Sequence, residues 1–148
     1  MQSRILVYGL VVGAAAALIA VGADLMVETD EEVIGELADG LVAGSAAERL
    51  DEVLRLTDPS RVEVAVRADG RTERFGPDAS DGDVVDAVQA ALRPLGAGEL
   101  EVVQRSVGVD GESARLALRV RADGEVHDLT LGLRRHGQGW LTQRIAVR

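Results

Sequence analysis

Apolar residues follow three spacings along the chain, and each spacing predicts a different kind of element. Residues 5–23 contain no charge. Residues 30–56 and 81–93 carry apolar positions three and four apart, and residues 99–147 alternate apolar with polar side chains. The order predicts an apolar segment first, then helices interrupted by one short hairpin, and finally a run of long strands.

The apolar segment over residues 5–23 is long enough to cross a membrane. As a helix its 19 residues reach about 28 Å, close to the hydrocarbon thickness of a bilayer. Arg4 precedes the segment and acidic residues follow it, which predicts an inward N-terminus and an outward remainder. We therefore expect a membrane anchor within residues 1–27 and an extracytoplasmic domain over residues 28–148.

A cleaved signal peptide fits the same segment. Val21-Gly22-Ala23 offers small residues suited to cleavage after Ala23, which would release a secreted or periplasmic domain. Gly9 and Gly13 lie four residues apart, the spacing of small residues by which membrane helices associate. The sequence leaves anchor and signal peptide open, and it leaves open whether Gly9 and Gly13 form a contact between two helices.

Three helices are predicted by capping residues and helical spacing. Thr29 and Ser45 each stand three residues before a glutamate, which is the pattern of a capping box. Ser80 opens a third apolar stripe, and Pro59 and Pro94 stand where the second and third stripes stop. Each predicted helix has one apolar face, so each must cover a surface.

The strands are predicted by alternation and by two-residue turn signals. Asp69-Gly70 separates two short alternating runs, and Asp110-Gly111, Asp123-Gly124 and the loop over residues 136–139 separate four longer ones. The strict alternation of residues 113–121 gives one apolar face and one face rich in arginine. The predicted fold class is α+β: three helices packed in a curved antiparallel sheet that forms a cone, preceded by a single transmembrane helix.

Composition narrows the chemistry that this fold could carry. The chain has 25 acidic and 16 basic residues, all of the basic ones arginine, and it has no cysteine. Disulfides, zinc–cysteine sites and cysteine or lysine nucleophiles are therefore excluded, and the net charge of -9 argues against nucleic acid as the main partner. Residues 24–60 hold 11 acids and two arginines. This acidic region is either a solvated face or a docking surface for a basic partner.

The order of the predicted elements resembles the nuclear transport factor 2-like superfamily, also called cystatin-like. Residues 129–141, with Ile145 and Val147, are similar to that family's final hairpin, in which a polar glycine turn leads into Trp140 and an apolar alternation. The resemblance implies a cone of helices and sheet over about residues 29–148. Because the superfamily includes isomerases, cyclases, dehydratases, transport factors and secretion scaffolds, it implies no single activity.

The predicted anchor adds a second resemblance. A membrane segment followed by such a domain is similar to the assembly component of type IV secretion systems. It is also similar to the small membrane proteins associated with actinobacterial lipid importers. Both resemblances imply a binding or scaffolding role.

Hairpin registers predict which polar side chains face the inside of the cone. Two-residue turns place Glu73, Arg105 and His127 on the apolar face. The expected partners are Val66 for Glu73, Leu116 for Arg105 and Val120 for His127. Simple alternation places Gln143 on the apolar face of the last strand. A pocket with a few convergent polar groups is the usual form of a ligand site, so these four residues are the ligand-pocket candidates. The other interpretation gives each of them a structural role or a place at the rim.

No set of catalytic or metal-ligating residues is predicted. His127 and Asp128 are adjacent and therefore face opposite sides of a strand, and the two histidines lack metal-ligand spacing. No serine has an acid–histidine pattern near it. Residues 78–83 look like a calcium loop but lack acids at the required positions, and helix capping explains them better. We expect no catalytic residue, no metal and no cofactor.

These observations favour a non-catalytic binding, scaffold or accessory protein of a cell-envelope assembly, held at the membrane. A lipid or small-molecule binder that uses the cone interior is the alternative, and an isomerase or cyclase is the third hypothesis. Arg115, Arg119 and Arg121 on the outer sheet face are the interface candidates. Their partner is either an envelope protein or the acidic helices of a second copy in a homodimer.

Overall fold

A computed structural model describes residues 29–148. The predicted membrane segment, the Gly9 and Gly13 pair and the cleavage position after Ala23 lie outside the described residues. Within the described part of the chain, none of the helices combines the length and apolarity that crossing a membrane requires.

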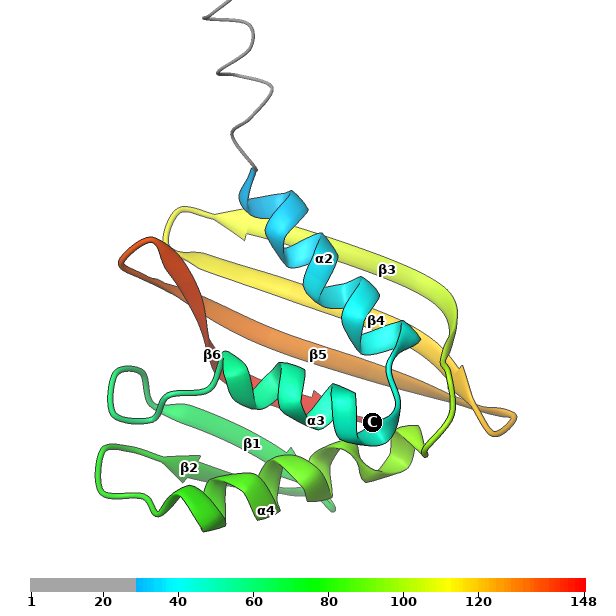
Figure 1. Cartoon of the computed structure of the whole chain (residues 1–148), viewed down its shortest axis with the longest axis horizontal. Coiled ribbons are helices and arrows are strands. Elements are labelled where there is room, and N and C mark those ends of the chain that lie inside the picture. Colours follow the sequence, from blue (N-terminus) through cyan, green and yellow to red (C-terminus); the bar gives the residue numbers. More distant parts are fainter. Residues whose placement is uncertain (1–28) are drawn as a thin grey trace, which may run out of the picture. The chain divides into compact units, whose positions relative to one another are not determined.

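The described residues form three α-helices, one short 3-10 helix and six strands, in the order that the sequence predicts (Figure 1). In chain order they are α2 (Asp30–Ala43), α3 (Ala46–Arg55), β1 (Val64–Ala68), β2 (Arg71–Phe75), α4 (Asp81–Leu92), η1 (Arg93–Leu95), β3 (Glu101–Asp110), β4 (Ser113–Ala122), β5 (Glu125–His136) and β6 (Gly139–Val147).

Two helices begin at the predicted caps. Ser45 accepts a hydrogen bond from the backbone N–H of Glu48, and the Glu48 carboxylate accepts one from the Ser45 N–H at 2.7 Å. At the start of α4, the Ser80 hydroxyl accepts from the Asp83 N–H at 3.2 Å. These bonds satisfy N–H groups that have no partner inside a helix, so both predicted starts are confirmed.

The six strands form one sheet in the order β2-β1-β6-β5-β4-β3. All neighbours are antiparallel except β1 and β6, which run parallel with Val66 opposite Ile145. The prediction of a wholly antiparallel sheet was wrong at this one pair. No hairpin joins β1 to β6, so no turn signal in the sequence determines their relative direction.

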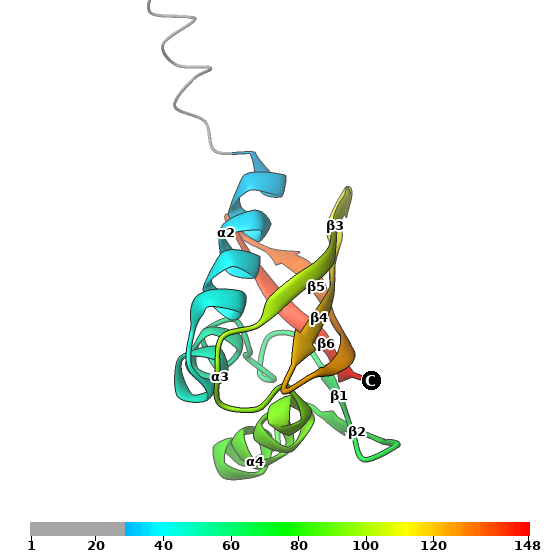
Figure 2. The same ribbon diagram turned by 90° about the vertical axis from the view of Figure 1, so that its right-hand side faces the viewer.

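The three helices cover one face of the sheet and leave the other face open (Figures 1 and 2). Strand positions on the covered face pack against α2, α3 and α4 and are sealed from solvent, with 0–1% of their surface exposed. They are Val64, Val66, Leu116, Leu118, Val120, Leu129, Leu131, Leu133 and Ile145. The space predicted as the interior of a cone is therefore filled by apolar side chains.

One arginine belongs to this core. Arg49 on α3 is 1% exposed, and its guanidinium donates hydrogen bonds to the carbonyls of Gly44 at 2.6 Å, Gly96 at 2.7 Å and Gly98 at 3.0 Å. Burial lowers the pKa of Arg49. The bonds to Gly96 and Gly98 join α3 to the loop that leads into β3 and so connect the helical layer to the sheet, and the bond to Gly44 joins α3 to the turn after α2.

Replacing Arg49 by methionine should destabilise the fold strongly. The variant R49M leaves three carbonyls without their charged donor, and hydrogen bonds to charged groups are each worth about 1.5–3 kcal/mol. We expect the free energy of unfolding to fall by about 3 kcal/mol. Urea unfolding followed by the fluorescence of Trp140, the only tryptophan in the chain, measures this. The exposed Arg93, changed to methionine, is the matched control, and equal midpoints for both variants would contradict the stabilising role of Arg49.

Candidate functional site

The four ligand-pocket candidates do not form one site. Glu73 pairs with Val66 as predicted but is exposed on the edge strand β2, whereas Arg105 lies on β3 at the opposite edge of the sheet. Five strand spacings of about 4.8 Å separate those two edges. His127 pairs with Val120 as predicted, and its side chain is 13% exposed, with Nε2 4.0 Å from a Glu125 carboxylate oxygen.

Arg105 connects the sheet to a helix. Its Nη1 lies 2.6 Å from Asp39 Oδ1, and its Nη2 donates to the Gly35 carbonyl of α2 at 2.7 Å. A Cβ on Gly35 would lie 2.8 Å from that Nη2, so any other residue at this position would displace the guanidinium. Arg105 pairs with Leu118 instead of Leu116 because the hairpin turns one residue later than predicted. That shift of two partner positions leaves the same face inward.

A bulge in β6 overturns the predicted position of Gln143. Gly132 pairs with Arg144 while Leu133 pairs with Thr142, so Gln143 has no partner residue in the ladder. Thr142 is fully buried, and Gln143 instead lines the open face of the sheet. The prediction that Gln143 faces the interior was wrong because simple alternation cannot reveal an extra residue in a strand.

The same bulge turns an arginine outward. Before the bulge, Trp140 and Thr142 face the core, and after it Ile145 does. Without the extra residue, Arg144 would share the inward face with Trp140 and Thr142, because side chains alternate along a strand. The bulge therefore lets Ile145 fill the core and places Arg144 in solvent.

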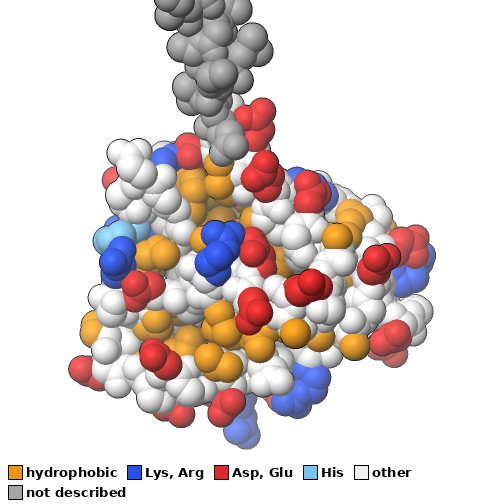
Figure 3. All heavy atoms as spheres, viewed as in Figure 1, with side chains coloured by type: hydrophobic (Ala, Val, Ile, Leu, Met, Phe, Trp, Pro, Cys, Tyr) orange, Lys and Arg blue, Asp and Glu red, His pale blue; other side chains and the backbone are white. Residues whose placement is uncertain are grey.

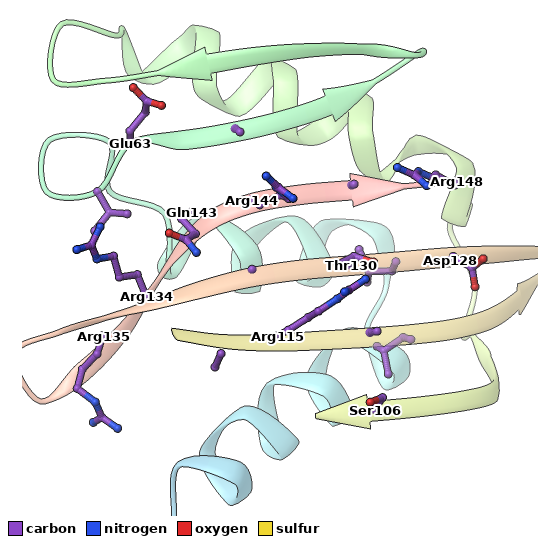
Figure 4. A pocket seen from close by; sticks show the side chains of 18 of the residues that line it. Glu63, Ser106, Arg115, Asp128, Thr130, Arg134, Arg135, Gln143, Arg144 and Arg148 are labelled. Carbon is purple, nitrogen blue, oxygen red and sulfur yellow. The ribbon is translucent and has the colours of Figure 1, made fainter. Parts of the chain in front are cut away.

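The open face of the sheet holds a groove of about 1130 Å³ (Figure 4). We call it the arginine groove, because eight arginines and three carboxylates line it. The arginines are Arg61, Arg74, Arg115, Arg119, Arg134, Arg135, Arg144 and Arg148, and the carboxylates are Glu63, Glu112 and Asp128. The lining is therefore strongly basic, although the chain as a whole is acidic.

Some of these arginines are already paired. Arg119 binds Asp128 with two hydrogen bonds of 2.8 and 3.1 Å, and Arg74 lies 3.0 Å from Glu63. The hydrogen bonds from Arg119, together with its charge and that of Arg148, hold the pKa of Asp128 below its ordinary value. These pairs are exposed, so each is worth little to stability on its own.

Three arginines of the groove make no side-chain hydrogen bond or ion pair with the residues that the structure describes: Arg115, Arg134 and Arg144. Each is exposed. Arg115 and Arg144 stand on either side of Gly132 on neighbouring strands, and a Cβ on Gly132 would lie only 3.2 Å from the Cβ of Arg144. An arginine without a carboxylate partner is suited to binding an anion from outside the domain.

The three interface candidates therefore differ in whether the arginine already has a carboxylate partner. Arg119 is bound to Asp128 and Arg121 to Glu101, the latter at 2.9 Å, whereas Arg115 has no ion-pair partner within residues 29–148. Sequence reasoning did not single out Arg144 as a partner of Arg115. Gly132 was the available signal, because an isolated glycine in a strand often marks a bulge or a close approach of two backbones.

The helix-covered side offers little for catalysis. The buried polar or charged residues of the described part are Arg49 and Thr142, and Thr142 Oγ1 has no hydrogen-bond partner there. Residues 29–148 contain no cluster of three or more histidine, aspartate and glutamate side chains that could hold a metal ion. The arginine groove is therefore the strongest candidate site.

Comparison with known proteins establishes the fold. No family model matches the chain, and no curated protein matches its sequence. A candidate dehydratase of the NTF2-like family from Streptomyces avermitilis superposes with a TM-score of 0.57 at 14% identity, covering 80% of this chain and 94% of the other. An NTF2-like protein of unknown function from Silicibacter pomeroyi gives 0.50 at 18%, covering 82% and 98%.

A de novo designed protein with a curved β-sheet gives a TM-score of 0.54 at 12% identity, covering 79% of this chain and 97% of the other. The described domain therefore has the nuclear transport factor 2-like fold, as the order of elements predicted: three helices on a curved six-stranded sheet. At these identities the likeness concerns the fold alone.

Replacing Asp128 by asparagine should flatten the dependence of stability on pH. The folded-state pKa of Asp128 is lowered, so its contribution is complete above the unfolded pKa of about 4 and is lost as the pH falls through the folded value. We expect D128N to lower the melting temperature at pH 7 and to reduce the loss between pH 7 and pH 3. Thermal unfolding monitored by circular dichroism measures both. The exposed Asp78, changed to asparagine, is the control, and identical pH profiles for the two variants would contradict the role of the pair.

Proposed function

We propose that this chain is a membrane-anchored, non-catalytic binding or scaffold protein of a cell-envelope assembly, and that it holds its partner on the open face of its sheet. The observation that carries the proposal is the contrast between the two faces of that sheet. One face is buried under the helices, and the other presents a basic groove with three unpaired arginines among the described residues.

The filled interior favours binding at the surface over binding inside. Leu118 and Leu131 on the covered face are 1% and 0% exposed, and Arg105 is held by Asp39 and Gly35. A small molecule in this space would have to displace packed apolar side chains, each worth about 1.5–3 kcal/mol on burial. The same packing counts against an isomerase or cyclase, which needs an enclosed pocket with converging polar groups.

The anchor is supported by the sequence alone. Residues 5–23 have the length and apolarity of a spanning helix, and Arg4 precedes an acidic flank. This pattern directs the domain to the outer side of the membrane. Cleavage after Ala23 is the alternative, and it delivers the same domain to the same side without an anchor.

Pairing of two copies through the open faces is disfavoured by charge. A two-fold axis brings each surface against itself, so the unpaired Arg115 and Arg144 would face a second copy of the same strongly basic groove. Helix-to-sheet pairing is electrostatically better, because the helix side carries acidic side chains around its apolar ones (Figure 3). That arrangement is head-to-tail and does not close into a dimer. A partner protein with an acidic surface avoids both the repulsion between arginines and the head-to-tail arrangement.

Single-cysteine variants test the proposal in the native membrane. The chain has no cysteine, so a Ser106→Cys variant reports on the groove, and an Ala97→Cys variant reports on an exposed loop outside it. We expect both to react with a membrane-impermeant maleimide in intact cells. We also expect the cysteine at position 106 to react several-fold more slowly in native membranes than in the purified full-length chain.

The two cysteines act as each other's control. Slower reaction at both positions in membranes would reflect general crowding, not occupancy of the groove. Labelling only after cell lysis would overturn the outward location. Equal rates at position 106 in membranes and in purified protein would overturn binding at the open face.

A further inference from the structure

The arginine groove runs across the strands, not along them. Residues from four neighbouring strands stand in one row at its floor, because Ala146 pairs with Thr130, Thr130 with Ala117, and Ala117 with Ser106. All four side chains are small. Three strand spacings of about 4.8 Å make this row roughly 14 Å long, which is room for about four residues of an extended chain.

Two further rows of residues form the walls. Arg144, Gly132 and Arg115 stand opposite one another on one side of the floor. On the other side, Arg119 holds Asp128. In Figure 4, Arg115 extends from β4 towards Thr130 on the next strand, over the floor of the groove. The wall of Arg144 and Arg115 thus carries positive charge without a carboxylate, whereas on the opposite wall Asp128 offsets part of the charge of Arg119 and of the neighbouring Arg148.

This asymmetry suits a peptide in which acidic and neutral residues alternate. Successive side chains of an extended chain point to opposite sides, so all the carboxylates of such a peptide would lie on the side of Arg144 and Arg115. The side chains between them would meet the neutralised Arg119–Asp128 pair. Each arginine can bind a carboxylate through two parallel hydrogen bonds. The hydroxyl groups of Thr130 and Ser106 can form hydrogen bonds with the backbone of the peptide.

Other anionic partners fit the groove less well. A flat lipid surface would not reach a floor that is recessed between arginine walls. Single-stranded nucleic acid is held by stacking on aromatic side chains, and the lining contains no Phe, Tyr or Trp, with His136 as its single aromatic ring. A uniformly charged polymer would also be repelled by the carboxylates of Asp128, Glu63 and Glu112 in the lining.

We propose that the groove over Ala146, Thr130, Ala117 and Ser106 is a docking site for an extended acidic peptide segment of a partner protein, with Arg115 and Arg144 as the carboxylate-binding residues. This inference rests on the proposed function, because it names the class of partner that the open face holds. It assigns specificity to the spacing of acidic residues along the peptide.

The direct test is a fluorescence anisotropy titration of the full-length chain in nonionic detergent. The probe is a labelled eight-residue peptide that alternates glutamate and serine, and a peptide of alternating lysine and serine is the charge control. We expect the acidic peptide alone to bind. The double variant R115Q/R144Q should weaken its binding by about tenfold or more, because each lost charge-assisted contact costs several-fold in affinity.

Two variants separate the groove from general charge. R71Q/R93Q removes two exposed arginines that do not line the groove, and its affinity should stay within about twofold of the wild type. Ala117→Leu leaves the charge unchanged and fills the floor, so it should also weaken binding. Circular dichroism spectra check that each variant is folded.

Each result that would contradict the expectations overturns a different part of the proposal. Equal losses in R115Q/R144Q and R71Q/R93Q would reveal non-specific attraction and overturn the site. No binding by the wild type, or stronger binding of labelled octathymidylate than of the acidic peptide, would overturn the peptide class. If the peptide fails while the cysteine at position 106 is still shielded in membranes, this inference is wrong and the proposed function stands. Arginine-dependent peptide binding without such shielding supports the site and counts against the proposed function.

Discussion

The burial of one face of the six-stranded sheet under three helices is the constraint on which the rest of the structure depends. Leucine and valine on that face have almost no exposed surface, and their burial supplies most of the free energy that holds the helices in place. Because side chains alternate along a strand, sealing one face necessarily turns the residues between them outward. The arginines of β4 occupy those outward positions, so the packing of the core also determines the charge of the open face.

The sequence could predict the elements whose signals are local. The capping residues Ser45 and Ser80 and the turns at Asp69-Gly70 and Asp123-Gly124 act within a few residues, and the structure agrees with each. The hairpin registers built on those two turns are correct to the residue, and they place Glu73 and His127 opposite the partners expected. Local turn chemistry is sufficient there because the two strands are joined directly.

The features that the sequence could not predict depend on distant parts of the chain. The parallel pairing of β1 with β6 has no connecting turn, and Arg49 finds its acceptors at Gly96 and Gly98, far along the chain. The bulge at Gln143 is recognisable only when β5 is placed beside β6, although Gly132 hinted at it. The sequence therefore predicts one of the two main arginines of the candidate site. The outward orientation of Arg115 follows from the alternation of side chains along its strand, whereas that of Arg144 depends on the bulge.

That bulge links the stability of the core to the candidate site. Ile145 is fully buried and Arg144 is exposed, and both positions require the single extra residue at Gln143. A regular β6 would bury the guanidinium of Arg144 without a partner, at a cost of several kcal/mol, and would expose Ile145. Bulges re-aim side chains in this way at functional edges of sheets. The position of Arg144 opposite Gly132 and in line with Arg115 is thus a consequence of how β6 packs its core, and a binding surface arises from the same register that closes the interior.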